Sequence, residues 1–415
     1  MSSPMSRLSD ASQPGQRVFV STMSTESALL AEELQADPER ARDVQFMGVQ
    51  FPGIDSTDYL GLHPQSRLTA YFMSPSVRRG LQQGRATLQG LDYLGIAHTL
   101  RQGPPVDVAI AQLSPPDADG HCSCLSSDFM PLVWQRAHQR IAHINPLMPR
   151  TRGSFSVDMR ELDGWVEAER PLLNYQEPVA GDIDLCIATH AASLVRDGDT
   201  LQFGIGTVPL ALGQALAQHR RLKVHAGMVT AVVQRLHAAG ALDADARITT
   251  GVALGDSGFR DFVARHAPLW FTDVGQTHDV AAIASIPRFV AVNAAVEVDL
   301  FGQVNSERMG GALQAGAGGL PAFAQGALRS EGGRLLICLR ATAARGAVSR
   351  IVPALDTQGL CTLPAYMADA VITEHGIAEL RGLSLEQRAQ ALIGIADPAH
   401  QPALQAAWEL QRAKL

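Results

Sequence analysis

One local pattern, a short apolar run followed by small residues and then a helix-forming stretch, occurs twice in the sequence. The first copy starts at Gly15 (GQRVFVSTMST) and the second at Gly198 (GDTLQFGIGTV), about 183 residues further on. A strand, a small-residue loop and a helix form the building unit of parallel α/β folds. A repeat over this distance therefore predicts two halves built alike.

Further apolar runs that are typical of buried strands lie at 106–114, 334–342 and 369–376, with helical patterns between several of them. We therefore predict an α/β fold made of two similar α/β domains. A chain of 415 residues is long for one core. The polar, Pro- and Gly-containing stretch at 174–184 separates the two patterns. We therefore predict a disordered tail at 1–14, an N-terminal domain at 15–180 and a C-terminal domain at 181–415.

Composition and charge exclude several classes of protein. The net charge is −7 and no cluster of Lys and Arg occurs, which argues against a nucleic-acid partner. The start of the chain is polar and no run of about 18 apolar residues follows, so we expect no signal peptide, no membrane span and a cytoplasmic protein. Cys122 and Cys124 beside His121 lack a second ligand pair, so we predict a turn there and no metal site.

Glycines cluster at two positions where a strand gives way to a helix. In LQFGIGTVP, Gly204 and Gly206 follow the apolar run of the second repeat, and GGALQAGAGGLPAF spans 310–323. Glycine lets backbone N–H groups approach a ligand, and a helix N-terminus favours negative charge. A tight structural turn, or close packing of backbone, explains the same residues equally well.

The stretch RLKVHAGMVTAVVQRL, at 221–236, passes from an apolar run through His225, Ala226 and Gly227 into an amphipathic helix. In α/β folds such crossovers face the crevice at the carboxyl end of the sheet, where ligands bind. This crossover offers one imidazole, one methyl group and a glycine.

Seven segments together resemble the acetyl-CoA hydrolase/transferase family, which includes 4-hydroxybutyrate CoA-transferases. They are YFMSPSVRRGLQQG, LSPPDADGHCSCLSSD, NPLMPRTRGS, GDTLQFGIGTVPLAL, EVDLFGQVNSERMGGALQAGAGG, SRIVPAL and VITEHGIAELRGLSLEQRAQALIGIADP. The resemblance implies an acyl-CoA site between two similar domains, a coenzyme A thioester as substrate, a small carboxylate or another acyl acceptor, no permanently bound cofactor and a homodimer.

In the mechanism that the resemblance implies, a glutamate attacks the thioester and carries CoA as a glutamyl thioester, while backbone amides of two glycine loops stabilise the oxyanion. These loops match Gly204–Val208 and Gly316–Gly319. The implied oxyanion and CoA-binding residues are Gly204, Gly206, Thr207, Val208, Gly316, Gly318 and Gly319.

The sequence departs from the family pattern at the nucleophile. Members carry a segment of the form Gly-Ile-His-Ser-Glu-Met, and an ungapped count from the first glycine loop places Gly227 at the glutamate, with His225 retained. After the second loop, Leu320 and its neighbours replace polar residues, which favours a less polar acyl group. Glycine cannot form an anhydride, so transfer through this position is excluded.

Several hypotheses follow. An acceptor attacks a bound acyl-CoA directly, or water attacks with His225 or another base assisting, or the protein binds acyl-CoA without turnover. A relocated nucleophile is a further alternative, with Glu297 as the candidate, although a structural carboxylate explains it as well. Arg350 suits CoA phosphates or an acceptor carboxylate, and a structural salt bridge is the alternative. His278 beside Asp279 suggests a base with an orienting acid.

Overall fold

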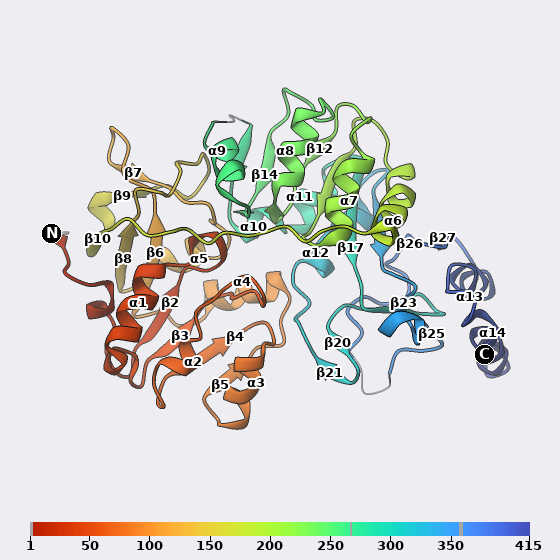
Figure 1. The fold of residues 1–415 in the computed structure, drawn as a ribbon, viewed down its shortest axis with the longest axis horizontal. Helices are drawn as coiled ribbons and strands as arrows, with labels where there is room; N and C mark the ends of the chain where they lie inside the picture. The colour runs from red at the N-terminus through yellow and green to blue at the C-terminus, as the bar shows by residue number, and fades with distance from the viewer. Residues whose placement is uncertain (1–2, 266–267, 357–359) are drawn as a thin grey trace. The chain divides into compact units, whose positions relative to one another are not determined.

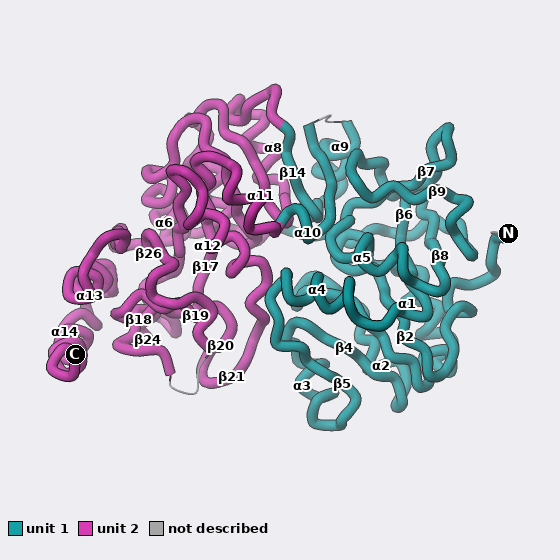
Figure 2. Tube along the Cα trace, turned by 180° about the vertical axis from the view of Figure 1, so that it is seen from behind, with its two compact units in different colours: residues 1–176, 247–277 teal, residues 177–246, 278–415 magenta. Residues whose placement is uncertain are grey.

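The computed structural model describes residues 3–265, 268–356 and 360–415, and the chain divides into two compact units (Figures 1 and 2). Unit 1 contains residues 1–176 and 247–277, and unit 2 contains 177–246 and 278–415. The chain first passes from unit 1 to unit 2 between residues 176 and 177, inside the stretch 174–184. The second domain is not the continuous segment that the sequence predicts, because residues 247–277 fold with unit 1.

The sheet of unit 1 has eight strands that pair in parallel throughout. In spatial order they are β1 (Ser3–Pro4), β10 (Gly164–Glu167), β8 (Gln139–Ile144), β6 (Val108–Leu113), β2 (Arg17–Val20), β3 (Gln45–Met47), β4 (Arg67–Ala70) and β5 (Ala86–Leu88). Every residue of β6 is buried. Such continuous burial is typical of a parallel strand covered on both faces, and it explains the unbroken apolar run in the sequence.

The chain of unit 1 reverses its direction of travel across the sheet between β2 and β6. Strands β3, β4 and β5 lie on one side of β2, and β6, β8 and β10 on the other. The crevice outside the carboxyl ends of the strands at such a reversal is where ligands bind in doubly wound folds. The helices of the first segment are η1 (Leu8–Ala11), η2 (Met23–Thr25), α1 (Ala28–Ala36), η3 (Pro38–Ala41), α2 (Tyr59–Leu62), α3 (Pro75–Gln82), α4 (Tyr93–Gln102), α5 (Met130–Trp134) and η4 (Met159–Glu161). A small antiparallel pair joins β7 (His121–Cys122) to β9 (Val157–Asp158).

The predicted disordered tail at 1–14 is wrong for the described residues, 3 onward. Strand β1 pairs with β10, Leu8 is fully buried, and the N–H of Ser9 donates to Glu33 at 2.8 Å. The sequence signal is weak because single apolar residues among polar ones show no period.

Residues 247–277 join unit 1 through backbone pairing. Isolated bridges connect Ser126 to Val252 and Gly153 to Phe271. A Cβ atom on Gly153 would overlap the carbonyl oxygen of Phe271, so this approach requires glycine. The segment contains β14 (Ile248–Thr250), β15 (Val252–Ala253), α9 (Ser257–Arg265), β16 (Leu269–Phe271) and α10 (Val274–Thr277), with β14 and β16 parallel.

Unit 2 is built on a six-stranded sheet. In spatial order its strands are β12 (Lys223–Val224), β11 (Thr200–Phe203), β17 (Phe289–Ala294), β22 (Arg334–Cys338), β26 (Ala370–Thr373) and β27 (Gly376–Glu379). All neighbours pair in parallel except β26 and β27, which form an antiparallel hairpin. The mixed α/β architecture with parallel sheets, predicted from the repeat, is confirmed.

The chain of unit 2 also reverses direction, here between β11 and β17. Because β-crossovers are right-handed, the helix that leads from β11 to β12 and the one that leads from β17 to β22 cover opposite faces of the sheet. The first is α7 (Thr207–Ala215) and the second is α12 (Leu320–Arg329), which packs against β17 and β22 (Figure 1). The two glycine clusters of the sequence precede these two helices.

The other elements of unit 2 complete its core. Its remaining helices are α6 (Asp182–Ser193), α8 (Ala231–Ala238), α11 (Val280–Ala284), η5 (Ala344–Gly346), α13 (Leu385–Gly394) and α14 (Gln401–Arg412). Its short strands are β13 (Met228–Val229), β18 (Glu297–Asp299), β19 (Val304–Asn305), β20 (Arg308–Met309), β21 (Ala312–Leu313), β23 (Thr342–Ala343), β24 (Val348–Ser349) and β25 (Ile351–Val352). Among the helices that the structure describes, none combines the length and apolar character needed to cross a bilayer.

Candidate functional site

The crossover that follows β12 lies at the carboxyl end of the unit 2 sheet. The N–H of His225 donates to the carbonyl of Leu201 on β11 at 3.0 Å, which extends the strand pairing by one residue. Ala226 is fully buried and Gly227 is half-buried. The crossover therefore has the position in the sheet that the sequence predicts.

The space next to Gly227 is filled by an imidazole. A Cβ atom placed on Gly227 would lie 2.5 Å from Cε1 and 2.9 Å from Nε2 of His278. Real Cβ atoms do not approach other atoms this closely. His278 directly precedes Asp279, the N-cap of α11, and is only 2% exposed. No side chain fits at Gly227 while His278 holds this place.

The same ring contacts the second glycine segment. Gly319 is the N-cap of α12, and a Cβ atom there would overlap Nε2 of His278 and lie 2.7 Å from its Cδ2. Both Gly227 and Gly319 are therefore needed as glycine for His278 to pack as it does. Sequence analysis does not find this contact, because the three residues are far apart in the chain.

Aromatic rings surround the imidazole. The rings of His278 and Phe323 lie 4.5 Å apart between centroids, Phe323 stacks on Phe289, and the His225 ring meets Phe289 edge-on at 6.0 Å. Burial, together with the neighbouring His225, lowers the pKa of His278 to about 3. His278 is therefore uncharged at neutral pH.

The first glycine loop has an open surface. A Cβ atom on Gly204 or Gly206 would meet no atom within 4 Å, so packing does not explain these glycines. Gly206 caps α7 with φ at +118°, which L side chains rarely adopt. The N–H groups of Thr207 and Val208 belong to the first turn of α7, where helical N–H groups lack intrahelical acceptors. The loop has the features of an anion site.

Side chains behind this loop hold it in place. The buried carboxylate of Asp184 pairs with Arg340 at 2.8 Å and accepts from the N–H of Gly181. Burial raises the pKa of Asp184, but the hydrogen bonds from Arg340, Gly181 and the Thr207 side chain outweigh it and lower the pKa. Thr207 therefore has a structural contact as well as its predicted place in the oxyanion loop.

The second glycine cluster divides into two parts. Gly310 and Gly311, both with positive φ, form the two-residue connection between β20 and β21, a turn type that favours glycine. Gly318, with φ at +60°, and Gly319 lead into α12, and Gly316 lies in the preceding loop. The hairpin accounts for the first pair, and the approach to His278 accounts for Gly319.

Glu297 is the first residue of β18, and Arg350 directly precedes β25, the strand that pairs with β18. Glu297, on β18, accepts from the side-chain amide of Asn305 at 2.9 Å, as a structural carboxylate does. Arg350 holds β18 through its backbone carbonyl, which accepts from the N–H of Val298. Its half-buried side chain has no hydrogen bond or ion pair within the described ranges. The salt bridge considered as an alternative for Arg350 is therefore absent from the described part of the chain.

Leu320 and the expected His278–Asp279 pair are the remaining predicted residues, and Ser349 and Glu374 are neighbours that hold the segment of Arg350. Leu320, the first residue of α12, is buried in the hydrophobic core. Ser349 donates to the carbonyl of Ile351, and Glu374 accepts from the N–H of Ala341, so both fix the segment that carries Arg350. The expected pairing of His278 with Asp279 is wrong, because the Asp279 carboxylate caps α11 by accepting from the N–H of Ala282. In the described residues, no group of three or more His, Cys, Asp and Glu side chains is arranged to hold a metal.

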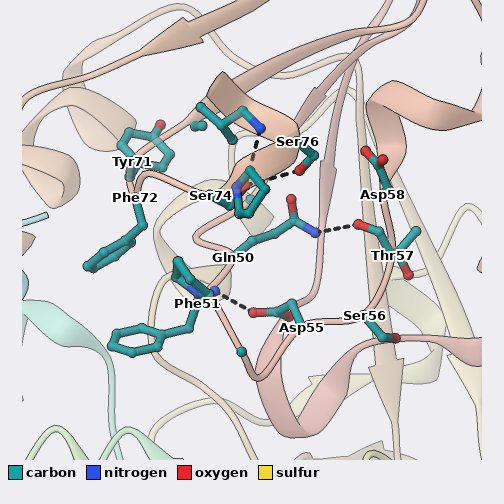
Figure 3. Close-up of a pocket in the computed structure, with 16 residues that line it drawn as sticks. Gln50, Phe51, Asp55, Ser56, Thr57, Asp58, Tyr71, Phe72, Ser74 and Ser76 are labelled. Carbon is teal, nitrogen blue, oxygen red and sulfur yellow. Dashed lines mark hydrogen bonds between the residues drawn. The ribbon is translucent and has the colours of Figure 1, made fainter. Parts of the chain in front are cut away.

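Unit 1 contains a separate cavity that sequence analysis misses. It has a volume of about 210 Å³ and lies at the carboxyl ends of β3 and β4. Figure 3 shows its polar wall, with Gln50 donating to Thr57 and Asp55 accepting from the N–H of Phe51. Phe51 and Phe72 supply an apolar side, with ring centroids 4.9 Å apart. The Phe51-Pro52-Gly53 sequence, a few residues after β3, is the sequence signal that points to this loop.

Two carboxylates, the buried Glu26 and the half-buried Asp55, hold the loop that lines this cavity. Glu26 accepts from the N–H groups of Ser56 and Thr57, and Asp55 accepts from Met23 at 2.6 Å. Burial, with a contribution from Glu26, raises the pKa of Asp55 to about 7. The cavity wall therefore contains a carboxyl group that titrates near neutral pH.

Comparison with known families agrees with this architecture. Residues 6–168 match the acetyl-CoA hydrolase/transferase N-terminal domain, and residues 255–408 match the acetyl-CoA hydrolase/transferase C-terminal domain. The chain therefore belongs to the acetyl-CoA hydrolase/transferase family.

Curated relatives with known activities cover most of the chain. It is 35% identical to the 4-hydroxybutyrate coenzyme A transferase of Clostridium kluyveri, over 83% of this chain and 82% of that protein. It is 33% identical to the butyryl-CoA:acetate CoA-transferase of Anaerostipes caccae, over 71% and 69% respectively. These relatives support acyl-CoA chemistry at the level of the family.

Solved structures share the fold. RipA from Yersinia pestis superimposes with a TM-score of 0.90 at 25% identity, covering 99% of this chain and 97% of that one. The 4-hydroxybutyrate CoA-transferase of Porphyromonas gingivalis gives a TM-score of 0.81 at 28% identity, with 97% and 95% covered. Both are similar to this chain over almost its whole length.

Proposed function

We propose that this protein transfers an acyl group or CoA between an acyl-CoA and an acceptor by direct attack of the acceptor, without a covalent glutamyl intermediate. The acceptor is a small carboxylate or another acyl acceptor, and coenzyme A enters and leaves as substrate and product. No cofactor is bound permanently. A homodimer, which the family resemblance implies, and a cytoplasmic location are part of this proposal.

The observation that carries the proposal is the packing at Gly227. The residue at the predicted nucleophile position has no side chain, and His278 fills the place where one would begin. A glycine cannot hold CoA as a thioester, so a family member built in this way needs attack by the acceptor itself.

Backbone amides support the chemistry that is left. The open glycine loop at Gly204–Val208 and the α12 N-terminus at Gly316–Gly319 are our candidates for the oxyanion donors. Donors of this kind retain substantial rate enhancement even where a nucleophile is removed. Arg350, without a described ion-pair partner, is our candidate for a CoA phosphate or an acceptor carboxylate.

Hydrolysis is the second candidate function, with water as the acceptor. It is favoured by two neighbouring imidazoles, because His225 lies close enough to His278 to contribute, after burial, to its lowered pKa. A binding protein without turnover is the remaining alternative.

Incubation with a panel of acyl-CoAs and acceptors tests the proposal. We expect loss of the acyl-CoA with time, and no reduced glutamate in the intact mass after borohydride trapping during turnover. A glutamate adduct would contradict direct attack. Thermal shifts with acyl-CoA but no turnover across the panel would indicate the binding protein instead.

A further inference from the structure

Another cavity of unit 1 gathers arginine side chains from two segments that are far apart in the chain. It has a volume of about 280 Å³, and no acidic side chain is among the described residues that line it. The cations that line it are Arg150, Arg152 and Arg265. Buried apolar side chains form part of its wall, namely Val263, Leu269 and Phe271. We refer to this space as the arginine cavity.

The backbone around Arg152 is fixed by contacts on both sides. The N–H of Thr151 donates to the hydroxyl of Ser123 at 2.9 Å, and the carbonyl of Arg152 accepts from the N–H of Phe271 at 2.7 Å. Gly153, the next residue, approaches Phe271 too closely for any Cβ atom. The backbone from which the Arg152 side chain projects is therefore already in place before a ligand arrives, which lowers the entropic cost of binding.

The three arginines differ in how far their charge is compensated. Arg150 pairs with Asp117 at 2.7 Å, and Arg265 lies 3.4 Å from Asp261, one helical turn earlier on α9. Neither carboxylate lines the cavity. Arg152 has no side-chain hydrogen bond or ion pair in the part of the chain that the structure describes. The interior of the cavity therefore attracts anions.

We propose that the arginine cavity binds a diphosphate group, the feature that inorganic diphosphate, nucleoside diphosphates and coenzyme A share. A guanidinium group is planar and donates two parallel hydrogen bonds to phosphate oxygens. Because cations from two segments face one space, an anion with several charges fits them better than a single carboxylate. The volume is close to the lower end of small-ligand pockets, which suits a compact anion.

This inference goes beyond the proposed function and does not rest on it. Every described residue of the cavity belongs to unit 1, whereas the glycine segments belong to unit 2. Binding is measured without turnover, so a failure of acyl transfer and a failure of diphosphate binding are seen in different experiments.

Titration calorimetry of the full chain tests the class of anion. The probes are inorganic diphosphate, inorganic phosphate and sulfate. We expect diphosphate to bind about tenfold more tightly than the other two, because it can contact arginines of both segments at once. No diphosphate binding, or equal affinities for sulfate and diphosphate, would overturn the inference.

A pair of charge-matched variants locates the binding. Arg152→Gln removes the cation without a described partner, and Arg42→Gln removes one from an exposed ion pair with Glu39 elsewhere in unit 1. We expect Arg152→Gln to weaken diphosphate binding about tenfold, and Arg42→Gln to change it by less than about twofold. Equal diphosphate affinity in the parent and Arg152→Gln would overturn the inference.

Folding of the variants is followed by their Tm. Arg152→Gln should keep the Tm of the parent, because its side chain has no described hydrogen bond or ion pair to lose. Arg265→Gln, on the other segment, is an independent variant for which we expect the same weakening of about tenfold. Unchanged diphosphate affinity in Arg265→Gln would show that the two segments do not share one anion, and would overturn the inference.

Titrations with ADP and coenzyme A identify the source of the diphosphate. If Arg152→Gln weakens ADP binding and leaves coenzyme A binding unchanged, the natural ligand class is a nucleoside diphosphate. Weakened coenzyme A binding in the variant would instead assign the cavity to the coenzyme. Adenosine lacks the diphosphate and serves as the control. Adenosine that binds as tightly as ADP would overturn the inference, since the diphosphate would then contribute nothing.

Discussion

At the scale of single residues, Gly227 tests whether the covalent mechanism can be restored. Gly227→Glu alone should fail to restore exchange through a glutamyl thioester, because its Cβ would lie 2.5 Å from the His278 ring. The ring cannot swing aside, since Gly319 and Phe323 contact it on other sides. We expect Gly227→Glu to lower stability by about 1–3 kcal/mol, as overpacked cores do.

The double variant Gly227→Glu/His278→Gly is the matched comparison. Removal of the ring vacates the space, so the two changes should be less destabilising together than the sum of the single effects. Urea unfolding of the four proteins in the cycle measures this coupling. Additive effects would show that the two residues do not compete for one space.

Asp128 offers a test of pH dependence. It is 3% exposed, and neither carboxyl oxygen has a hydrogen-bond partner among the residues described. Burial, with a contribution from Asp273, raises its pKa to about 8 from 3.8. The folded state then holds a proton that the unfolded state releases, so stability falls as pH rises from about 4 to about 8.

Asp128→Asn removes this loss of stability. The free energy of unfolding of the variant, relative to that of the parent, should rise by up to about 1.4 kcal/mol for each pH unit between 4 and 8. Urea unfolding at pH 5 and pH 8 measures it, with the exposed Asp119→Asn as control. An advantage that stays constant with pH would show that Asp128 is ionised in the folded protein.

At the scale of elements, the two glycine segments make opposite predictions. A Cβ atom on Gly204 meets open space, whereas one on Gly319 overlaps the His278 ring. Gly204→Ala should therefore change stability by no more than about 0.5 kcal/mol, and Gly319→Ala should destabilise by about 1–3 kcal/mol. If the first loop binds the thioester, Gly204→Ala should still weaken the acyl-CoA thermal shift. An unchanged shift would show that the loop only turns the chain.

The sequence predicts elements better than it predicts contacts between them. The repeat finds β2 and β11, each beside the reversal point of its sheet, because strand, loop and helix are local patterns. The loops that follow these two strands differ, however. The loop after β11 contains the glycines and leads into α7, whereas the loop after β2 forms η2, with Met23 at φ +55°. The contact of His278 with Gly227 depends on how separate segments pack, and no local period encodes it.

At the scale of the whole molecule, the return of the chain to unit 1 escapes prediction for the same reason. The segment 247–277 contains strands and helices of ordinary composition, and only its pairing partners assign it to unit 1. Backbone bridges from Ser126 and Gly153 provide those partners. Local sequence patterns predict the strands, but they do not predict which strands or loops each one pairs with.

This arrangement predicts how fragments fold. A fragment of residues 181–415 contains 247–277 without its partners from unit 1, and apolar side chains such as Phe259 and Phe271, which are buried in the full chain, lose part of their cover. We expect it to aggregate, bind a hydrophobic dye and melt without a cooperative transition. A fragment of 177–415 in which a flexible Gly/Ser linker replaces 247–277 should retain the six-stranded sheet of unit 2 and melt cooperatively. Circular dichroism melts of both fragments beside the full chain provide the measurement, and a cooperative transition in 181–415 alone would show that residues 247–277 fold without the strands of unit 1.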